Sequence, residues 1–307
     1  MAFRKPTQFE RKYLKDQLRN MLTCQMSKLT VEQLASWTMG KSQNAFVSYL
    51  RCFHNKNLPK AVRACQKRFR AKCTKFPYES LQNGCHKLLM AAHGEVSFNE
   101  VPTEHHKSVK EYIKCTASIY RKIKHCVPIL EKECRKRQYK AIKLLRADMD
   151  FVEDLLDDWA DVKVVYSTRD PRGILTSRRE DHRLFSRSLV REAPFLCKKM
   201  ERDLETFKML KEKYPSKFFR TSYEELAKNP LKMTKKVYKF LGIPLSQKVQ
   251  DLMYSMTHAK KDQGAFNTVR SNATATSMAW RRKLKQSEKI KIDKACKNVY
   301  KNFKYVR

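Results

Sequence analysis

Apolar residues in the second half of the chain follow two alternating patterns, short apolar runs and longer stretches with apolar side chains three or four positions apart. The short runs predict strands, and the longer stretches predict amphipathic helices. The expected strands are Ala141–Leu145, Val162–Ser167 and Lys217–Thr221, and the expected helices are Phe151–Trp159, Pro171–Glu180, Leu231–Leu241 and Glu288–Val299. This alternation indicates an α/β fold with a parallel sheet, in which ligands bind at the carboxyl ends of the strands.

The first part of the chain has a different character. Residues 1–136 are very basic and helical in tendency, with apolar positions at helical spacing in Tyr13–Met26 and Tyr112–Ile123. No Gly/Ser-rich linker, internal repeat or low-complexity tract separates this part from residues 137–307, and the whole chain contains 6 glycines. We therefore expect a basic, mainly helical part at 1–136 joined without a flexible linker to an α/β part at 137–307.

The best-marked change from strand to helix follows the apolar run Val162–Ser167. Asp170 is a favourable N-cap residue, and Pro171 suits the first helical position. An anion at this point would meet free backbone N–H groups and the positive end of the helix dipole. Arg169 adds a planar set of donors suited to phosphate, and Ser177 follows on the helical face of Gly173. These residues predict a site for a phosphate monoester.

A cluster of acidic residues lies just before that strand. Seven carboxylates between Asp148 and Asp161 raise the alternatives of a metal site or a pair of acid/base groups. Phe151, Leu155 and Trp159 recur within the same stretch at helical spacing. We therefore interpret it as an amphipathic helix with a solvated acidic face, and no metal site is predicted in the chain.

The string from Arg169 to Arg178, R-D-P-R-x-x-x-x-S-R, resembles the 3′-phosphate-binding segment of sulfotransferases. These enzymes use 3′-phosphoadenosine 5′-phosphosulfate (PAPS) as the sulfate donor. Further segments, at Phe218–Leu226, Asn229–Gly242 and Asn272–Arg281, are similar to the Y-E-D-L turn, the helix after it and the C-terminal N-[AS]-[TS]…A-W-R segment of Golgi carbohydrate sulfotransferases. Upstream, Glu133–Lys136 and Ile142–Arg146 resemble the E-C-R-K and I-K-G-V-R segments of that family.

The resemblance covers roughly residues 110–307 and implies both a fold and a reaction. The fold would be the α/β sulfotransferase fold, which is similar to that of P-loop kinases, with helices flanking a parallel sheet. The reaction would be sulfate transfer from PAPS to the 6-hydroxyl of galactose, N-acetylglucosamine or N-acetylgalactosamine in a glycan or proteoglycan. The implied location is the lumenal side of the Golgi.

The same resemblance implies the residues that bind the nucleotide. Arg169 and Ser177 would fix the 3′-phosphate, with Arg172, Tyr223 and Arg270 as further nucleotide contacts. The sequence differs from the family pattern at three positions. Ser271 and Ser222 stand where the family has arginine, and Leu144 stands where it has glycine. No catalytic base is assigned, because the polar candidates Glu100, His105 and His106 are of a type and context usual for surface residues.

One family feature is missing from the sequence, the 5′-phosphosulfate loop of the type R-S-G-[ST]-[ST]. The nearest segment, Met39–Ser42, ends like a phosphate-binding loop but follows an expected helix, Thr30–Trp37, instead of a strand. An apolar membrane anchor and a signal peptide are not found either. Two explanations stay open: the sequence lacks an upstream part that carries these elements, or the protein is a divergent relative that binds nucleotide or sulfated glycan without transferring sulfate.

The charge of the chain is compatible with both a sulfate-transferring enzyme and a binding protein, and it does not discriminate between them. The formal net charge is +36, from 67 basic and 31 acidic residues spread along the sequence. Such a chain attracts polyanions, whether sulfated glycans, anionic membranes or nucleic acids. A nucleic-acid-binding protein is therefore the third hypothesis, supported by charge alone. Specific nucleic-acid recognition is not expected, because no nucleic-acid-binding motif accompanies the charge.

Cysteine usage indicates an oxidising compartment. The chain has 10 cysteines and no C-x-x-C pair, which argues against a structural zinc site. Disulfides in a secretory compartment are the favoured interpretation, with the pairing left open. Asn272-Ala273-Thr274 is also an acceptor sequence for N-glycosylation.

Overall fold

The computed structural model describes residues 8–36, 48–49, 51–52, 60–65, 103–144, 147–156, 159, 161–180, 188–263 and 268–305. Its contacts divide the chain into two compact units, an N-terminal unit that ends at residue 145 and a C-terminal unit that runs from residue 146 onward. The charge and hydrophobic pattern of the sequence had suggested a boundary at residues 136/137. Nowhere in the described ranges is there a helix long and apolar enough to cross a membrane.

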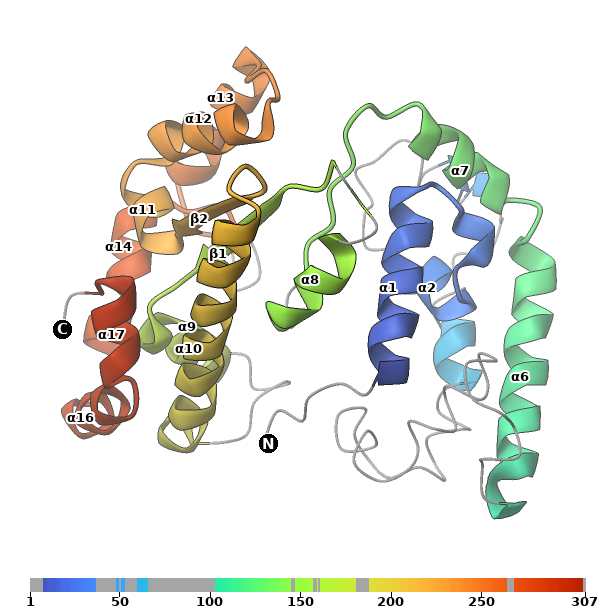
Figure 1. Cartoon of the computed structure of the whole chain (residues 1–307), viewed down its shortest axis with the longest axis horizontal. Coiled ribbons are helices and arrows are strands. Elements are labelled where there is room, and N and C mark those ends of the chain that lie inside the picture. The colour runs from blue at the N-terminus through green and yellow to red at the C-terminus, as the bar shows by residue number, and fades with distance from the viewer. Residues whose placement is uncertain are drawn as a thin grey trace. The chain divides into compact units, whose positions relative to one another are not determined.

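The N-terminal unit is helical in its described part, in line with the periodicity of its sequence. Its elements are α1 (Gln8–Leu22), η1 (Met26–Lys28), α2 (Val31–Ser36), α6 (Thr103–Ile123) and α7 (Val127–Arg135) (Figure 1). Their apolar faces share one core, in which Leu34 and Ile123 are fully buried. The expected helices Tyr13–Met26 and Tyr112–Ile123 correspond to α1 and α6, with α1 ending earlier, at Leu22.

Disulfides join segments of the N-terminal unit that are far apart in sequence. The pairs are Cys24–Cys134, Cys52–Cys126 and Cys65–Cys115. They link the first third of the chain to α6 and α7, and each closes a long loop in the unfolded chain. The expectation of paired cysteines is confirmed. Among the described residues, one group of Cys and His side chains is compact enough for a metal ion, namely Cys52, His125 and Cys126. The two cysteine sulfurs of this group are bonded to each other in the Cys52–Cys126 disulfide.

The C-terminal unit contains a parallel pair of strands, β1 (Val164–Thr168) and β2 (Phe218–Ser222). The register pairs Val164 with Phe218 and Thr168 with Ser222, so both strands end at the same edge of the sheet. The Oγ1 hydroxyl of Thr168 donates to the Thr221 carbonyl at that edge, over 3.2 Å. The expected strands Val162–Ser167 and Lys217–Thr221 are thus confirmed to within two residues.

The third expected strand, Ala141–Leu145, is wrong in its described part. Residues 141–144 have no regular secondary structure, and all four are exposed. The apolar pattern suggested a strand, but a strand is stable only where its side chains pack on neighbours, and Ile142 and Leu144 remain 37% and 43% exposed.

Helices surround the strands in the C-terminal unit. They are α8 (Asp150–Leu156), α9 (Pro171–Arg179), α10 (Leu189–Lys213), α11 (Tyr223–Lys228), α12 (Pro230–Leu241), α13 (Gln247–Thr257), α14 (Ala273–Met278), α15 (Trp280–Lys283), α16 (Gln286–Ala295) and α17 (Lys297–Phe303) (Figure 1). The α/β class expected from the sequence is confirmed, as a helix-rich unit with a small parallel sheet in the described residues.

The long helix α10 organises the core of this unit. Its buried face carries Leu196, Met200, Leu204 and Phe207, and the Phe207 ring lies edge-on to Phe218 of β2 at 5.8 Å. The disulfide Cys197–Cys296 joins α10 to the junction between α16 and α17. The single helix expected over Glu288–Val299 is in fact these two helices, because Cys296 leaves the helical backbone conformation at its disulfide.

Part of the acidic stretch before β1 forms the expected amphipathic helix, which ends at Leu156 and does not include Trp159. In α8, Phe151, Val152, Leu155 and Leu156 are all buried against the core. The nearby carboxylate of Asp148 pairs with Lys199 at 2.6 Å. The buried apolar face of α8 and the Asp148–Lys199 pair agree with the amphipathic interpretation for the described part of this segment.

Candidate functional site

The turn between β1 and α9 has the local structure that its sequence predicts. Asp170 caps α9, and its Oδ1 atom accepts a hydrogen bond from the backbone N–H of Arg172 at 2.9 Å. Pro171 occupies the first helical turn, where its missing N–H costs no hydrogen bond. This turn lies at the carboxyl end of β1, the edge at which parallel sheets bind ligands.

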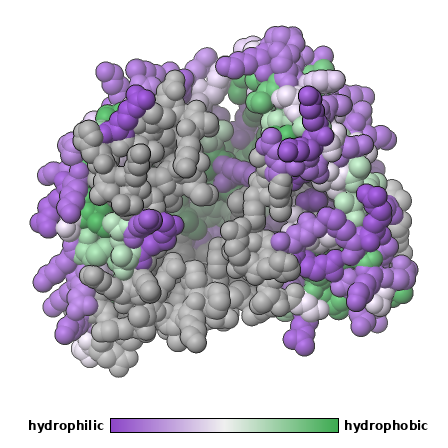
Figure 2. Space-filling model, turned by 180° about the vertical axis from the view of Figure 1, so that it is seen from behind, coloured by the Kyte–Doolittle hydropathy of each residue, from purple (hydrophilic) through white to green (hydrophobic). Residues whose placement is uncertain are grey.

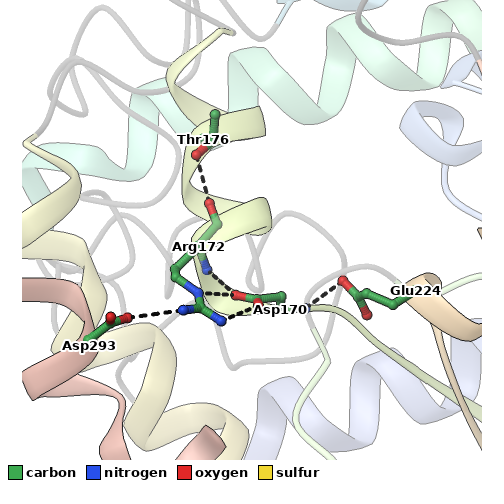
Figure 3. A network of polar contacts seen from close by, with 5 residues as sticks. All are labelled: Asp170, Arg172, Thr176, Glu224 and Asp293. Carbon is green, nitrogen blue, oxygen red and sulfur yellow. Dashed lines mark hydrogen bonds and ion pairs between the residues drawn. The ribbon is translucent and has the colours of Figure 1, made fainter. Parts of the chain in front are cut away.

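The side chain of Arg172 is buried beneath this turn. Its guanidinium makes two hydrogen bonds to the Asp170 carboxylate, of 3.0 and 2.7 Å, and a longer ion pair of 3.4 Å to Asp293 of α16 (Figure 3). It also lies over the rings of Trp280 and Tyr300, at 3.9 and 4.5 Å. Burial by itself would lower the pKa of Arg172, but the bonds to Asp170 outweigh it and raise the pKa.

This geometry gives Arg172 a different role from the one the resemblance implied. Its side chain is 2% exposed and is occupied by protein groups, so it does not fit a direct nucleotide contact. Instead it holds the C-terminal helices against the turn that carries Asp170. We therefore interpret Arg172 as a positioning residue.

Arg169 stands at the end of β1 and is partly buried. Its guanidinium lies over the ring of Tyr223, the first residue of α11, at 4.5 Å. Its Nε atom is buried and has no hydrogen-bond partner within the described residues. An arginine with an unused donor at a helix N-terminus is suited to an anion.

Gly173 provides the space that this arginine needs. A Cβ atom at position 173 would lie 3.0 Å from the Arg169 Nε atom and 3.5 Å from Cδ1 of Trp280. A Cβ atom here would crowd the guanidinium, while its distance to the indole is that of an ordinary van der Waals contact. The missing side chain of Gly173 thus leaves room for the Arg169 guanidinium. Ser177 itself is exposed on the second turn of α9.

Glu224 is a member of the site that the sequence analysis did not single out. Its Oε1 atom accepts a hydrogen bond from the backbone N–H of Asp170 at 3.0 Å (Figure 3). Burial raises the pKa of Glu224, and the neighbouring charge of Asp170 adds to this effect, while the hydrogen bond and Arg169 oppose it. The sequence did contain a signal for Glu224. Parallel strands end at the same edge of a sheet, so residues that directly follow β2, such as Tyr223 and Glu224, are expected near the turn that follows β1.

The C-terminal segment packs on this side of the unit. Asn272 caps α14 by accepting a hydrogen bond from Ala275 N at 2.8 Å, and Thr274 Oγ1 donates to the Ala227 carbonyl of α11 at 3.1 Å. Arg270, just before this helix, is half-buried, and its Nη1 atom donates to the Val269 carbonyl at 2.7 Å. Asn272 is exposed, as a glycosylation acceptor has to be.

The structure brings some of the predicted residues together. Arg169, Arg172 and Tyr223 meet at the carboxyl edge of β1 and β2, while Arg270 lies at the start of the C-terminal segment. Glu100 and the loop candidate Met39–Ser42 lie outside the described residues. His105 and His106 belong to α6 of the N-terminal unit.

Comparisons with family models and with curated proteins agree on one protein family. Residues 102–304 match the family model described as "Sulfotransferase domain". Carbohydrate sulfotransferase 1 of Mus musculus is 32% identical over 184 residues, covering 54% of this chain and 44% of the relative. Carbohydrate sulfotransferase 4 of Mus musculus is 27% identical over 188 residues, and carbohydrate sulfotransferase 3 of Rattus norvegicus is 24% identical over 179 residues. These matches cover 55% and 52% of this chain, and 48% and 38% of those relatives. The chain thus spans less than half the length of these relatives, and no solved structure matches it.

Proposed function

The chain belongs to the sulfotransferase-domain family, and on this premise we propose that it transfers a sulfuryl group from PAPS to a hydroxyl of a carbohydrate. The observation that carries the proposal is Arg169 at the carboxyl end of β1. Its guanidinium is held by Tyr223, and its buried Nε atom has no partner in the described part of the chain. A phosphate dianion at this point would gain charge-assisted hydrogen bonds and would also face the N-terminus of α9.

The nucleotide would be fixed through its 3′-phosphate. Arg169 would donate the principal hydrogen bonds, and the exposed hydroxyl of Ser177 on α9 would be a second donor. Tyr223 orients Arg169 by stacking, and Arg172 holds the turn from below through Asp170. Arg270 is kept as a further contact from the C-terminal segment.

The acceptor side of the proposal comes from the relatives, which are named as carbohydrate sulfotransferases. We propose a glycan or proteoglycan acceptor with sulfation at a 6-hydroxyl. The four disulfides in the described residues agree with a secretory compartment, and the proposed location is the Golgi lumen.

The reaction sets the requirements on the site. The acceptor oxygen attacks sulfur in line, and the bond between sulfur and the oxygen of the 5′-phosphate breaks, with its electron pair remaining on that oxygen. The hydroxyl proton passes to a base. Groups around the 3′-phosphate act by positioning, because they are remote from the reacting sulfur.

Transfer of labelled sulfate from PAPS to defined oligosaccharides tests the proposal. We expect a sulfate ester on a carbohydrate hydroxyl, and an Arg169→Ala variant in which KM for PAPS rises far more than kcat falls. Nucleotide binding without any transfer across a panel of galactose- and hexosamine-containing acceptors would favour a binding protein instead of an enzyme.

A further inference from the structure

Helix α12 carries a row of lysines on one face. It contains Lys232, Lys235, Lys236 and Lys239 and no acidic residue. We refer to these four as the basic stripe. At 100° per residue they fall on one face of the helix, and all four are exposed. At a rise of 1.5 Å per residue the stripe is roughly 10 Å long.

None of these lysines forms an ion pair with a carboxylate of the described residues. Other exposed cations of the protein do have partners, such as Lys213 with Glu153 at 3.3 Å and Arg179 with Glu288 at 3.2 Å. Clustered like charges repel one another, so the stripe is a surface that gains free energy when a polyanion covers it.

The stripe leads directly into a groove between α12 and α13. The groove has a volume of about 300 Å³ and is lined by Lys228, Leu231 and Lys232 on one side and Gln250, Tyr254 and His258 on the other. Leu231 and Lys232 border both the groove and the surface over the stripe. The two features are therefore one continuous surface, on the side of the unit where Figure 1 shows α12 and α13.

The far wall of the groove carries a stacked pair of rings, Tyr254 and His258. The rings of Tyr254 and His258 are stacked at 4.5 Å with an interplanar angle of 12°, and Tyr254 is 68% exposed. Leu231 is 40% exposed beside it. Large apolar side chains left exposed next to a groove are typical of a binding surface. A sugar ring has an apolar face of C–H groups, which suits the outer face of the exposed Tyr254 ring.

We infer that the basic stripe and the groove together bind a sulfated oligosaccharide, a chain that alternates sugar rings with negative charges. A sugar face would lie on the outer face of the Tyr254 ring, whose other face stacks on His258, and the sulfates would meet the lysines. A duplex nucleic acid or an anionic bilayer supplies charge but no separate sugar faces for the groove. The inference rests on the proposed function only for the choice of glycan as the polyanion, and it makes this enzyme one that holds polymers already bearing sulfate.

The test is a titration of the full chain with a fluorescent sulfated chondroitin oligosaccharide and with its unsulfated counterpart. In a Lys232→Gln/Lys236→Gln/Lys239→Gln variant we expect affinity for the sulfated probe to fall by at least about tenfold, with a shallower salt dependence. The matched control is Lys291→Gln/Lys294→Gln/Lys297→Gln, which removes the same charge from exposed positions of α16 and α17 and should retain near-wild-type affinity. Tyr254→Ala should weaken binding severalfold even at high salt.

Equal losses in the stripe and control variants would overturn the inference, because affinity would then follow net charge alone. Tighter binding of a duplex RNA or of phosphatidylserine vesicles through the same three lysines would overturn the choice of a glycan. Adenosine 3′,5′-bisphosphate is titrated against every variant. If the nucleotide fails to bind even the wild-type protein, the proposed function fails. Glycan binding by the basic stripe is tested separately, by comparing the affinities of the two lysine variants.

Discussion

At the scale of single residues, the buried guanidinium of Arg172 joins separate parts of the C-terminal unit. It bridges Asp170, which caps α9, and Asp293 of α16, and it is enclosed by the rings of Trp280 and Tyr300. A buried ion pair of this kind contributes less through its own attraction than through the penalty for losing one partner.

Replacing Arg172 by methionine should therefore be strongly destabilising. The Asp170 carboxylate would stay buried without its ion pair, at a cost of about 3–5 kcal/mol in the free energy of unfolding. Urea unfolding of the variant measures this cost. The control is Arg135→Met, which removes an exposed i,i+4 pair with Glu131 and should cost under about 1 kcal/mol. Comparable losses in both variants would show that Arg172 is not a structural bridge.

Glu224 makes the stability of the unit depend on pH. Because burial raises its folded-state pKa above the ordinary value of 4.5, the native state binds this proton more tightly than the unfolded chain does. The contribution of Glu224 to the unfolding free energy is therefore lost as pH rises from 4.5 through the raised pKa.

A Glu224→Gln variant keeps an oxygen that accepts the Asp170 N–H bond but cannot ionise. Its unfolding free energy relative to wild type should increase with pH across that window and level off above it. Unfolding measured over a pH series checks this. A difference between the two proteins that does not change with pH would mean that Glu224 has the same pKa in both states.

Only some residues of the site could be predicted from the sequence. The N-cap Asp170 and the helix start at Pro171 were predictable because capping is local chemistry. The burial of Arg172 was not, since its partners Asp293 and Trp280 lie more than a hundred positions away along the chain. Glu224 likewise gains its role from the parallel register of β1 and β2.

At the scale of elements, strong periodicity predicted α9 and α12 to within one residue at each end, and it predicted the C-terminal part of α6, which begins earlier, at Thr103. The larger errors lie where tertiary contacts decide. Ile142 and Leu144 had the pattern of a strand but no core to pack on. The break between α16 and α17 is located at Cys296, whose disulfide partner could not be deduced from spacing.

The Cys197–Cys296 disulfide should be the main covalent support of the C-terminal unit. It joins cysteines 99 positions apart, so its removal frees a large loop in the unfolded chain. We expect Cys197→Ala/Cys296→Ala to lower the free energy of unfolding by about 2–5 kcal/mol. Denaturant unfolding without reductant measures this change. Unfolding at the wild-type midpoint would contradict it, and Cys65→Ala/Cys115→Ala, with a separation of 50, is the shorter-loop comparison.

At the scale of the whole molecule, a net charge of +36 is combined with several disulfides and with the strand-to-helix turn that carries Arg169. Hydrophilic side chains cover much of the coloured surface in Figure 2. Charge alone predicts only attraction to polyanions. The family match over residues 102–304 and the site at the end of β1 turn this general property into a specific proposal, a basic protein that handles an anionic donor and a glycan.

The central claim is that Arg169 binds the 3′-phosphate of a nucleotide, and thermal unfolding with adenosine 3′,5′-bisphosphate tests it most directly. At a hundredfold excess over Kd the ligand should stabilise the protein by about 2.7 kcal/mol, and 5′-AMP at the same concentration should do far less. Arg169→Ala should abolish the shift. Arg220→Ala, which removes another arginine stacked on a ring, that of Phe303, should preserve it. A shift that 5′-AMP reproduces in full, or that survives Arg169→Ala, would contradict the account.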